Sequence, residues 1–364
     1  MHSERLLLGP GPSNPYPEAV EALGRPVLGH LDPEYLDLVA DTSERLRTVF
    51  GTRNRLTLPV SGTGSAGMEA CLASLLEPGD EAIVGVNGYF GERLAEVARR
   101  LGAQVQTVQA EWGSPLHPEQ LLDAQRRAPQ ARLVAVVHAE TSTGVRNDVA
   151  PLRALQDTDT FLLLDTVTSL GGIGVEADAW GVDAAYSATQ KCLGAPSGMS
   201  PVTLSDRALE RVRSRRTPVS SFYLDLGLLE AYYLDRPPRY HHTASSTMVS
   251  ALHAGLGRLL EEGLPAVAAR HDRIGTLLQD TLPELGFELL AAKGHRLPQL
   301  TAARLPDGVD DATARSALRK RFGIEVGGGL GPLAGVGWRI GLMGHNATDR
   351  ALATLLGAVR CVLG

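Results

Sequence analysis

The chain has 364 residues, of which 43% are hydrophobic and 21% charged, a composition typical of a soluble globular protein with room for two domains. The formal net charge of −6 argues against nucleic acid as the main partner. No apolar run approaches the roughly 18 residues of a membrane span, and no secretory signal is visible, so we expect a cytoplasmic protein without a membrane partner.

Metal and nucleic-acid sites are not expected. Three cysteines, at positions 71, 192 and 361, are too widely separated for a disulfide framework or a metal-ligand motif, so free thiols are predicted. The adjacent residues His241 and His242 point in different directions on any regular element, which disfavours a shared metal. The basic run from Arg211 to Arg216 is interpreted as a solvated helix face.

The first part of the chain predicts an α/β fold. Residues 1–15 are rich in Pro and Gly and predict an extended arm. Beyond the arm, short apolar runs alternate with helical patterns such as Glu92–Leu101, and this alternation indicates a mostly parallel sheet buried on both faces. The strand candidates are Ala82–Val86, Val105–Val108, Leu133–His138, Phe161–Asp165, Ala184–Ser187 and Ser200–Leu204.

The pattern changes near Gly263. The segment Ser245–Glu262 predicts a connecting helix, and helical segments dominate after it, followed by short strands and helices. We therefore predict a large α/β domain over residues 16–262 and a smaller α+β domain over residues 263–364. The elements expected in the smaller domain are Ala266–Leu282, Leu300–Leu305, Ala312–Phe322 and Trp338–Ile340.

Lys191 is unusual because the chain has 35 basic residues but Lys at only three positions. Arg can replace Lys as a charge, but only a Lys amine can lose its proton and condense with an aldehyde to a Schiff base. Lys191 lies in the run Y-S-A-T-Q-K-C-L-G, where a strand-like segment gives way to a loop rich in Gly and Pro. This position predicts a lysine that binds pyridoxal phosphate; the alternative is a solvated surface residue.

Asp165 closes the apolar run F-L-L-L-D and so lies at the carboxyl end of a predicted strand. Ligands bind at that edge of an open α/β sheet. A buried carboxylate needs a partner, and in a pyridoxal enzyme the protonated pyridine nitrogen provides one. The alternative is a helix N-cap ahead of Thr166.

Further segments fit the same cofactor. The small-residue run from Ser61 to Ala70 leads into a helix and can bind a phosphate, which Gln190 can also reach. Phe90 follows a strand and can stack on the pyridine ring. For the neighbouring Tyr89, a place at the site and packing in the hydrophobic core are equally compatible with the sequence. Thr141 or Ser142 can donate a hydrogen bond to the phenolic oxygen of the cofactor; the alternative is that these hydroxyls form a turn. Arg339 can bind the carboxylate of a substrate; the alternative is a structural ion pair.

Together these segments resemble the class V, fold-type I pyridoxal-phosphate aminotransferases, most closely the alanine–glyoxylate / serine–pyruvate aminotransferase family. The resemblance runs nearly end to end, from L-L-L-G-P-G-P-S-N at Leu6 through L-L-L-D-T-V-T-S-L-G-G at Leu162 to R-I-G-L-M-G-H-N-A-T at Arg339. It implies a large sheet domain of the seven-stranded type, a smaller C-terminal α+β domain, and a homodimer with shared active sites.

The resemblance also implies residue roles. Lys191 forms the Schiff base and moves the proton, Asp165 pairs with the pyridine nitrogen, and Arg339 binds the substrate carboxylate. The supporting residues are Phe90 on the ring, Thr141 near the phenolic oxygen, Ser169 and the backbone of Gly11 beside the substrate, and, around the phosphate, Ser61, Gly62, Thr63 and Gln190 with Tyr240 and Thr243 from the other subunit.

The expected reaction is a ping-pong transfer of the amino group from alanine or serine to glyoxylate or pyruvate. Small donors are favoured because no second cation for a side-chain carboxylate is evident near the pocket. One alternative is an (S)-ureidoglycine–glyoxylate aminotransferase of purine breakdown. A cysteine desulfurase would need a nucleophilic Cys in the comparable segment Ile324–Gly331, which has none. A non-enzymatic pyridoxal-binding module is disfavoured, because the expected catalytic positions are filled and no DNA-binding segment is attached.

Overall fold

The computed structural model describes residues 5–363 and contains a seven-stranded sheet with strand order β2-β10-β9-β8-β5-β3-β4. β10 runs opposite to the other six strands, which share one direction, so the predicted mostly parallel α/β fold is confirmed. The strands are β2 (Leu56–Ser61), β3 (Glu81–Val86), β4 (Gln104–Gln109), β5 (Leu133–Val137), β8 (Phe161–Asp165), β9 (Ala184–Tyr186) and β10 (Met199–Leu204).

All six predicted strands are present, but β2 was missed. Its residues Leu56–Ser61 include Pro59, and a Pro inside an apolar run argues against a central strand. In the structure β2 is an edge strand, where a missing backbone donor is tolerated, and Pro59 lies opposite Pro201 of β10.

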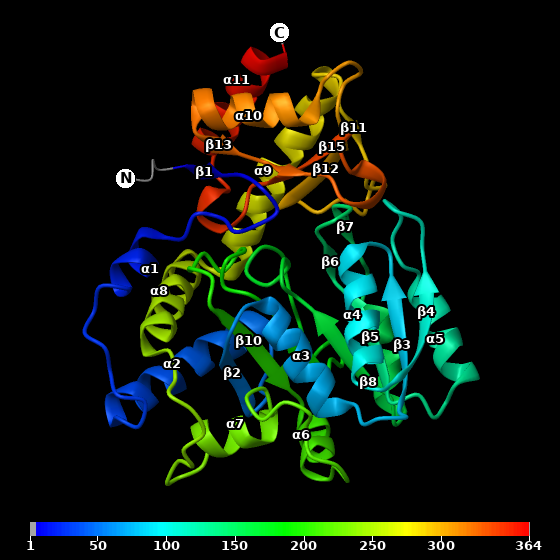
Figure 1. The fold of residues 1–364 in the computed structure, drawn as a ribbon, viewed down its shortest axis with the longest axis vertical. Helices are drawn as coiled ribbons and strands as arrows, with labels where there is room; N and C mark the ends of the chain where they lie inside the picture. Colours follow the sequence, from blue (N-terminus) through cyan, green and yellow to red (C-terminus); the bar gives the residue numbers. More distant parts are fainter. Residues whose placement is uncertain (1–4, 364) are drawn as a thin grey trace.

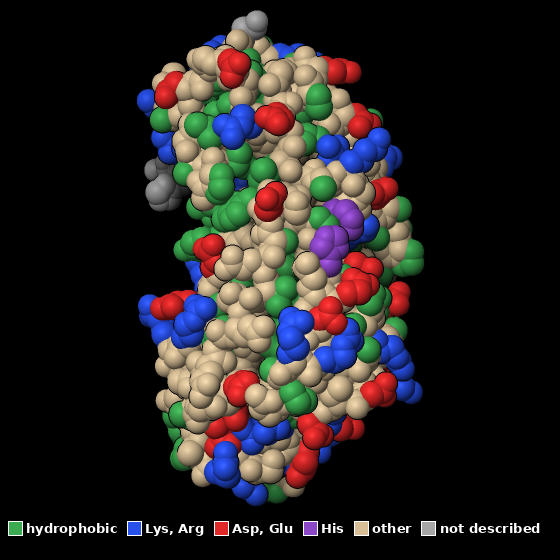
Figure 2. All heavy atoms as spheres, turned by 90° about the vertical axis from the view of Figure 1, so that its right-hand side faces the viewer, with side chains coloured by type: hydrophobic (Ala, Val, Ile, Leu, Met, Phe, Trp, Pro, Cys, Tyr) green, Lys and Arg blue, Asp and Glu red, His purple; other side chains and the backbone are tan. Residues whose placement is uncertain are grey.

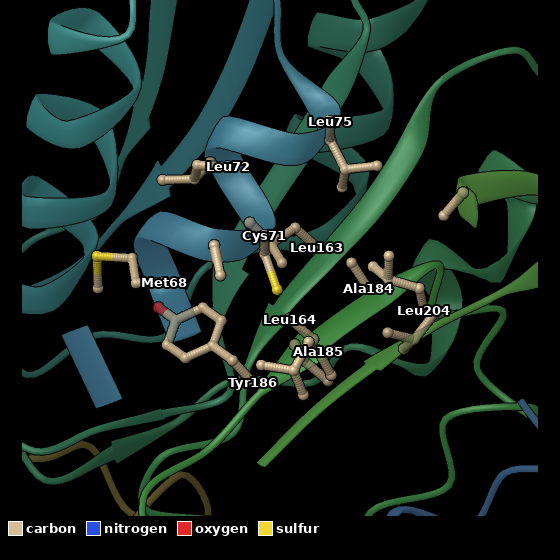
Figure 3. Close-up of a cluster of buried hydrophobic side chains, with 14 of the residues drawn as sticks. Met68, Cys71, Leu72, Leu75, Leu163, Leu164, Ala184, Ala185, Tyr186 and Leu204 are labelled. Atoms are coloured by element: carbon tan, nitrogen blue, oxygen red, sulfur yellow. The ribbon is translucent and has the colours of Figure 1, made fainter. Parts of the chain in front are cut away.

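Helices cover both faces of the sheet (Figure 1). Figure 3 shows Cys71, Leu72 and Leu75 of α3 in one buried cluster with Leu163 and Leu164 of β8 and Ala184 and Ala185 of β9, and the side chains of all seven residues are fully buried. Each fully buried Leu contributes about 1.5–3 kcal/mol to folding. The helices of this part are α1 (Pro17–Ala22), α2 (Pro33–Phe50), α3 (Gly64–Leu75), α4 (Tyr89–Arg100), α5 (Pro118–Arg127), α6 (Asp206–Arg213), α7 (Leu226–Tyr233) and α8 (Ser246–Glu262).

A second hydrophobic core lies beside the carboxyl ends of the parallel strands, above the large sheet in Figure 1. It contains a four-stranded antiparallel sheet, and Leu8 of the N-terminal segment is buried in it. α8 ends at Glu262 and α9 begins at Leu264, while the division into domains at this point stays a prediction. The elements are β11 (Glu288–Leu289), β12 (Leu300–Arg304), β14 (Gly327–Gly328), β15 (Gly337–Gly341), α9 (Leu264–Glu284), α10 (Asp311–Phe322) and α11 (Asp349–Leu363).

The N-terminal segment runs from the smaller core to the edge of the large sheet. The described part of the predicted arm, residues 5–15, contains no helix, and the first four residues lie outside the described part. Its strand β1 (Leu6–Leu7) pairs in parallel with β13 (Ile324–Glu325). Two further short strands, β6 (Ala139–Glu140) and β7 (Val145–Arg146), form a hairpin beyond β5.

The described residues include no helix long and apolar enough to cross a membrane. Over the same residues, no group of three or more His, Cys, Asp or Glu side chains is placed to bind a metal ion. On the face drawn in Figure 2, acidic and basic side chains are interspersed and neither sign gathers into a patch.

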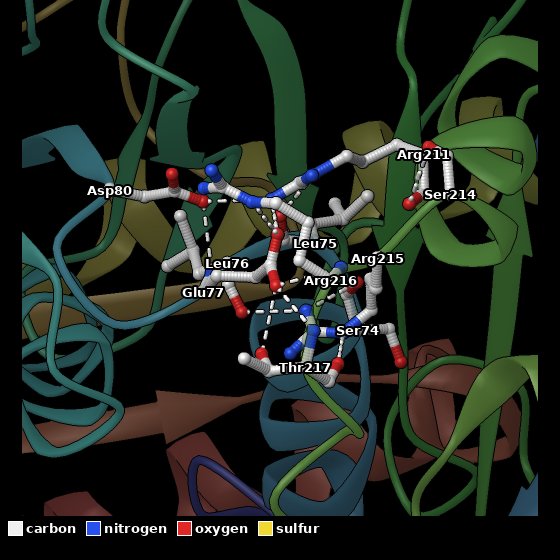
Figure 4. A network of polar contacts seen from close by, with 10 residues as sticks. All are labelled: Ser74, Leu75, Leu76, Glu77, Asp80, Arg211, Ser214, Arg215, Arg216 and Thr217. Atoms are coloured by element: carbon white, nitrogen blue, oxygen red, sulfur yellow. Dashed lines mark hydrogen bonds and ion pairs between the residues drawn. The ribbon is translucent and has the colours of Figure 1, made fainter.

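The basic run at the end of α6 is partly buried, which corrects the interpretation as a solvated face. The side chain of Arg211 is only 12% exposed and forms an ion pair of 2.8 Å with Glu77, which follows α3 (Figure 4). Glu77 also accepts hydrogen bonds from the backbone N–H groups of Arg216 (3.0 Å) and Thr217 (2.8 Å). The network therefore ties the segment after α6 to the end of α3.

Replacement of Glu77 by Gln is expected to lower the free energy of unfolding by about 2 kcal/mol at pH 7. Burial raises the pKa of Glu77, but hydrogen bonds from Thr217 and Arg211 outweigh burial and lower it to about 2, from an ordinary value of 4.5. The contribution is therefore present above pH 4.5 and is lost as the pH falls toward 2. Urea unfolding of both proteins between pH 7 and pH 3 measures this; a constant difference across that range contradicts the assignment.

Candidate active site

The carboxyl ends of the parallel strands surround a cavity of about 210 Å³. Asp165 is the last residue of β8, and Lys191 lies in the loop after β9. Both line the cavity, together with residues that follow β2, β3 and β5, so chain segments far apart in sequence meet at one edge of the sheet. The lining residues are Thr63, Gly64, Ser65, Met68, Phe90, Arg93, Val137, Ala139, Thr141, Asp165, Val167, Thr168, Tyr186, Gln190 and Lys191.

Lys191 is buried, with 9% of its surface exposed. Its Nζ donates a hydrogen bond to the carbonyl oxygen of Pro10 in the N-terminal segment. Burial and the nearby Arg339 lower the pKa of Lys191 to about 8, which increases the uncharged, nucleophilic fraction near neutral pH. Gly11 has a φ of +112°, and a Cβ there would overlap Nζ, so only glycine leaves room for the amine.

Asp165 is held by two donors. The hydroxyl of Tyr186 donates to Oδ2 at 2.6 Å, and the N–H of Val167 donates to Oδ1 at 2.8 Å. Burial raises the pKa of Asp165 to about 6, although the hydrogen bonds from Tyr186 and Val167 act in the opposite direction. The hydrogen bond from Val167 lies in a turn and not at the start of a helix, so Asp165 is not the helix N-cap considered as an alternative. Reasoning from sequence missed Tyr186, which lies directly opposite Asp165 on β9 and beside Met68 in Figure 3.

The N-terminus of α3 opens at the cavity. The N-cap residue Thr63 makes no capping hydrogen bond through its side chain, so the amide groups of the first turn stay available to a ligand. Gly62 has a φ of +128°, and a Cβ at this position would lie 2.5 Å from the Cβ of Ala66. The tight turn before α3 therefore requires glycine.

Three predicted site residues have buried polar atoms that no described residue satisfies: Ser61 Oγ, Ser169 Oγ and Gln190 Oε1. Buried polar groups are normally hydrogen-bonded. Phosphate oxygens accept hydrogen bonds, and the Ser61 hydroxyl and the side-chain amide N–H groups of Gln190 can donate them. Together with the open N-terminus of α3, these groups fit a phosphate-bearing ligand.

Phe90 of α4 and Thr141 after β6 are far apart in the sequence but line the same cavity. Arg93, three residues beyond Phe90 and so on the same helix face, also lines it. The Arg93 guanidinium lies 4.9 Å from the ring centre of Tyr89 and 5.2 Å from that of Phe90. The expectation that the pocket has no second cation is therefore wrong.

Comparison with known proteins decides the family. The Aminotransferase class-V family model matches residues 16–335. The chain belongs to the class-V aminotransferases. A solved alanine–glyoxylate aminotransferase from Nostoc sp. superposes with a TM-score of 0.97 at 44% identity, covering 100% of this chain and 96% of that one.

Two curated relatives of this aminotransferase carry different names. The (S)-ureidoglycine–glyoxylate transaminase of Bacillus subtilis is 35% identical over 99% of this chain and 90% of its own length. The alanine–glyoxylate aminotransferase of Drosophila melanogaster is 38% identical over 98% of this chain and 92% of its own length. The overall match therefore establishes the class of reaction, whereas the identity of the amino donor depends on the residues of the pocket.

In the aminotransferase, Arg339 of β15 is not among the residues that line the cavity. It is half-buried, and its Nε donates to the carbonyl oxygen of Gly328 at 2.9 Å. No carboxylate among the described residues is within ion-pair distance of Arg339, so the ion pair considered as an alternative is not present there. Arg339 contributes, after burial, to the lowered pKa of Lys191.

Tyr240 and Thr243 of the aminotransferase are not brought to the cavity of their own chain. Both are exposed in the segment between α7 and α8, and Tyr240 is 62% exposed. The ring of Tyr240 packs against the ring of His30, with 5.2 Å between the ring centres. Any role of these two residues in cofactor binding therefore requires a second subunit.

Proposed function

We propose that this aminotransferase uses pyridoxal phosphate to transfer the amino group of alanine or serine to glyoxylate or pyruvate. The proposal rests on one observation: a buried lysine and a buried aspartate line one cavity together with Gln190 and the open N-terminus of α3. When bound, pyridoxal phosphate supplies an aldehyde that condenses with amines and a ring that withdraws electrons.

The residues of the chain divide the remaining tasks. Lys191 Nζ takes the proton from the α-carbon of the amino donor, and its lowered pKa favours the uncharged base. Asp165 provides the negative charge that stabilises a protonated ring nitrogen. Phe90 and Thr141 orient the ring from two sides, and Arg339 binds the α-carboxylate through its free guanidinium nitrogens. Ser169 and the backbone of Gly11 complete the substrate side.

Small amino donors are favoured in spite of Arg93. A side-chain carboxylate on the donor would extend from the α-carbon, which must lie near Lys191. The Arg93 guanidinium already lies against the rings of Tyr89 and Phe90, so we assign it to these rings and not to such a carboxylate. The relatives from Nostoc and Drosophila named for alanine and glyoxylate support the same assignment.

(S)-Ureidoglycine is the second candidate donor, because the Bacillus relative named for it matches the chain over nearly its full length. Single-turnover spectroscopy separates the candidates. The visible absorbance band of bound pyridoxal phosphate is followed after addition of L-alanine, L-serine or (S)-ureidoglycine, and its return is followed with glyoxylate or pyruvate. Rapid bleaching by alanine or serine, reversed by glyoxylate, is the expected result. Bleaching by ureidoglycine alone contradicts it, and absence of any band contradicts the cofactor itself.

A homodimer is the proposed working unit, with Tyr240 and Thr243 reaching the phosphate of the partner's site. Support comes from large apolar side chains exposed at the surface: Val27 is 78% exposed and Phe222 is 67% exposed. Sedimentation at micromolar concentration tests this, and a monomeric active enzyme contradicts it. We also propose a cytoplasmic location, which agrees with free thiols at Cys71, Cys192 and Cys361 and can be checked by cell fractionation.

A further inference from the structure

We propose that Glu140 is a positioning residue that holds Phe90 and Thr141 in a fixed relation in the lining of the cofactor cavity. Glu140 belongs neither to the predicted catalytic residues nor to the lining of the cavity. The inference rests on the proposed function, because Phe90 and Thr141 act on a cofactor ring only if pyridoxal phosphate binds there.

The carboxylate of Glu140 has no exposed surface and accepts four hydrogen bonds. Oε2 accepts from the N–H groups of Phe90 (3.1 Å) and Gly91 (3.2 Å) at the start of α4. Oε1 accepts from the N–H (3.0 Å) and the hydroxyl (2.6 Å) of Ser142. The Ser142 hydroxyl oxygen in turn accepts from the N–H of Tyr89 at 2.9 Å. Glu140 and Ser142 therefore satisfy the first three amide groups of α4.

This arrangement replaces the local cap that α4 lacks. Its N-cap residue is Gly88, which has no side chain to accept from the first turn. A Cβ at position 88 would overlap Ser142 Oγ and approach Glu140 Cγ, so the glycine makes room for the distant carboxylate. An anion at a helix N-terminus is also favoured by the helix dipole. The start of α4 is consequently fixed by the β6 segment and not by its own sequence.

The consequence for the cavity follows from chain connectivity. Thr141 is the residue after Glu140, and Phe90 is bonded to Glu140 through its own N–H. One side chain therefore sets the separation between the ring-stacking residue and the hydroxyl expected near the phenolic oxygen. Burial and the neighbouring carboxylate of Asp165 raise the pKa of Glu140 to about 7, whereas the hydrogen bonds from Ser142 and Gly91 lower it and so favour the charged form.

The test compares Glu140→Gln with a matched control, Glu77→Gln. Both remove a buried carboxylate that accepts from two backbone N–H groups of another segment, but Glu77 lies beyond the far end of α3 from the cavity. A Gln amide can accept at only one oxygen and directs N–H groups at the other donors. Glu140→Asp keeps the charge, and Ser142→Ala removes only the bonds of the Ser142 hydroxyl, so the milder variants stay informative if Glu140→Gln does not fold.

Four readouts are taken on each purified protein: stability, amide hydrogen exchange of residues 89–91 without cofactor, the affinity for pyridoxal phosphate, and the circular dichroism of the bound cofactor. Glu140→Gln is expected to weaken cofactor binding about tenfold or more, change the dichroism and speed exchange at residues 89–91. Glu140→Asp recovers part of the affinity. Glu77→Gln lowers stability with affinity and dichroism unchanged.

Wild-type affinity and dichroism in Glu140→Gln, with a stability loss like that of Glu77→Gln, would overturn the inference and leave Glu140 a purely structural residue. Failure of the wild-type protein to bind pyridoxal phosphate is a different result. It would remove the proposed function, and the role assigned to Glu140 on a cofactor would be lost with it, whereas the exchange data would still report whether Glu140 fixes the start of α4.

Discussion

Replacement of Lys191 by Ala lowers the rate of amino transfer by at least about 10³-fold, within the range expected when a positioned acid–base group is lost. The reason is positional as well as chemical. Lys191 is the lysine whose amine enters the cavity beside Pro10 and Gly11, and its pKa of about 8 lies close to the working pH. The measurement is the half-reaction with L-alanine in a single turnover.

Lys191→Arg is the matched control for charge. A guanidinium keeps the positive charge near Asp165 but neither condenses with an aldehyde nor gives up its proton near neutral pH. We expect it to be as inactive as Lys191→Ala. Cofactor binding should survive in both variants, since the phosphate contacts proposed for Ser61 and Gln190 are unchanged. A Lys191→Arg enzyme with a tenth or more of wild-type activity would contradict the role of the amine.

The elements and residues that sequence predicts best are those determined by local pattern. Apolar runs such as Leu133–Val137 are buried throughout and became β5, and Asp165 at the end of such a run lies at the ligand-binding edge. Lys191 was recognisable because its chemistry excludes Arg. These inferences need only the periodicity of hydrophobic residues and the rule that the carboxyl ends of parallel strands meet at one edge of the sheet.

The features that sequence missed depend on partners distant in the chain. α4 begins at Tyr89, three residues before the predicted start, because Glu140 and Ser142 cap it. Arg211 was taken as solvated because its partner Glu77 follows another helix. Tyr186 faces Asp165 only through the pairing of β8 with β9. Such contacts are set by tertiary structure, so no local pattern contains them.

Asp165→Asn is expected to lower kcat about 10²–10³-fold, the loss typical of a single group that stabilises developing charge, with a smaller effect on KM. An amide cannot keep a ring nitrogen positively charged. Tyr186→Phe serves as the control: it removes the 2.6 Å hydrogen bond to Oδ2 but keeps the carboxylate. We expect a loss of about tenfold for this variant, measured in the same alanine half-reaction. Equal losses in both variants would show that hydrogen bonding, and not charge, is what matters.

Stability provides an independent check on Asp165. Burial raises its pKa from 3.8 to about 6, so in the absence of cofactor the folded state binds the proton more tightly than the unfolded state. Stability must then fall as the pH rises from 3.8 through 6, because ionising the buried carboxyl costs free energy. The neutral Asn avoids this cost, and cofactor-free Asp165→Asn should unfold at a higher temperature than the wild type above pH 6, with the difference vanishing near pH 4. An inactive variant that is also less stable at pH 8 would indicate a damaged fold. Loss of activity together with a gain in stability would show that the charge of Asp165 serves catalysis and lowers the stability of the cofactor-free protein.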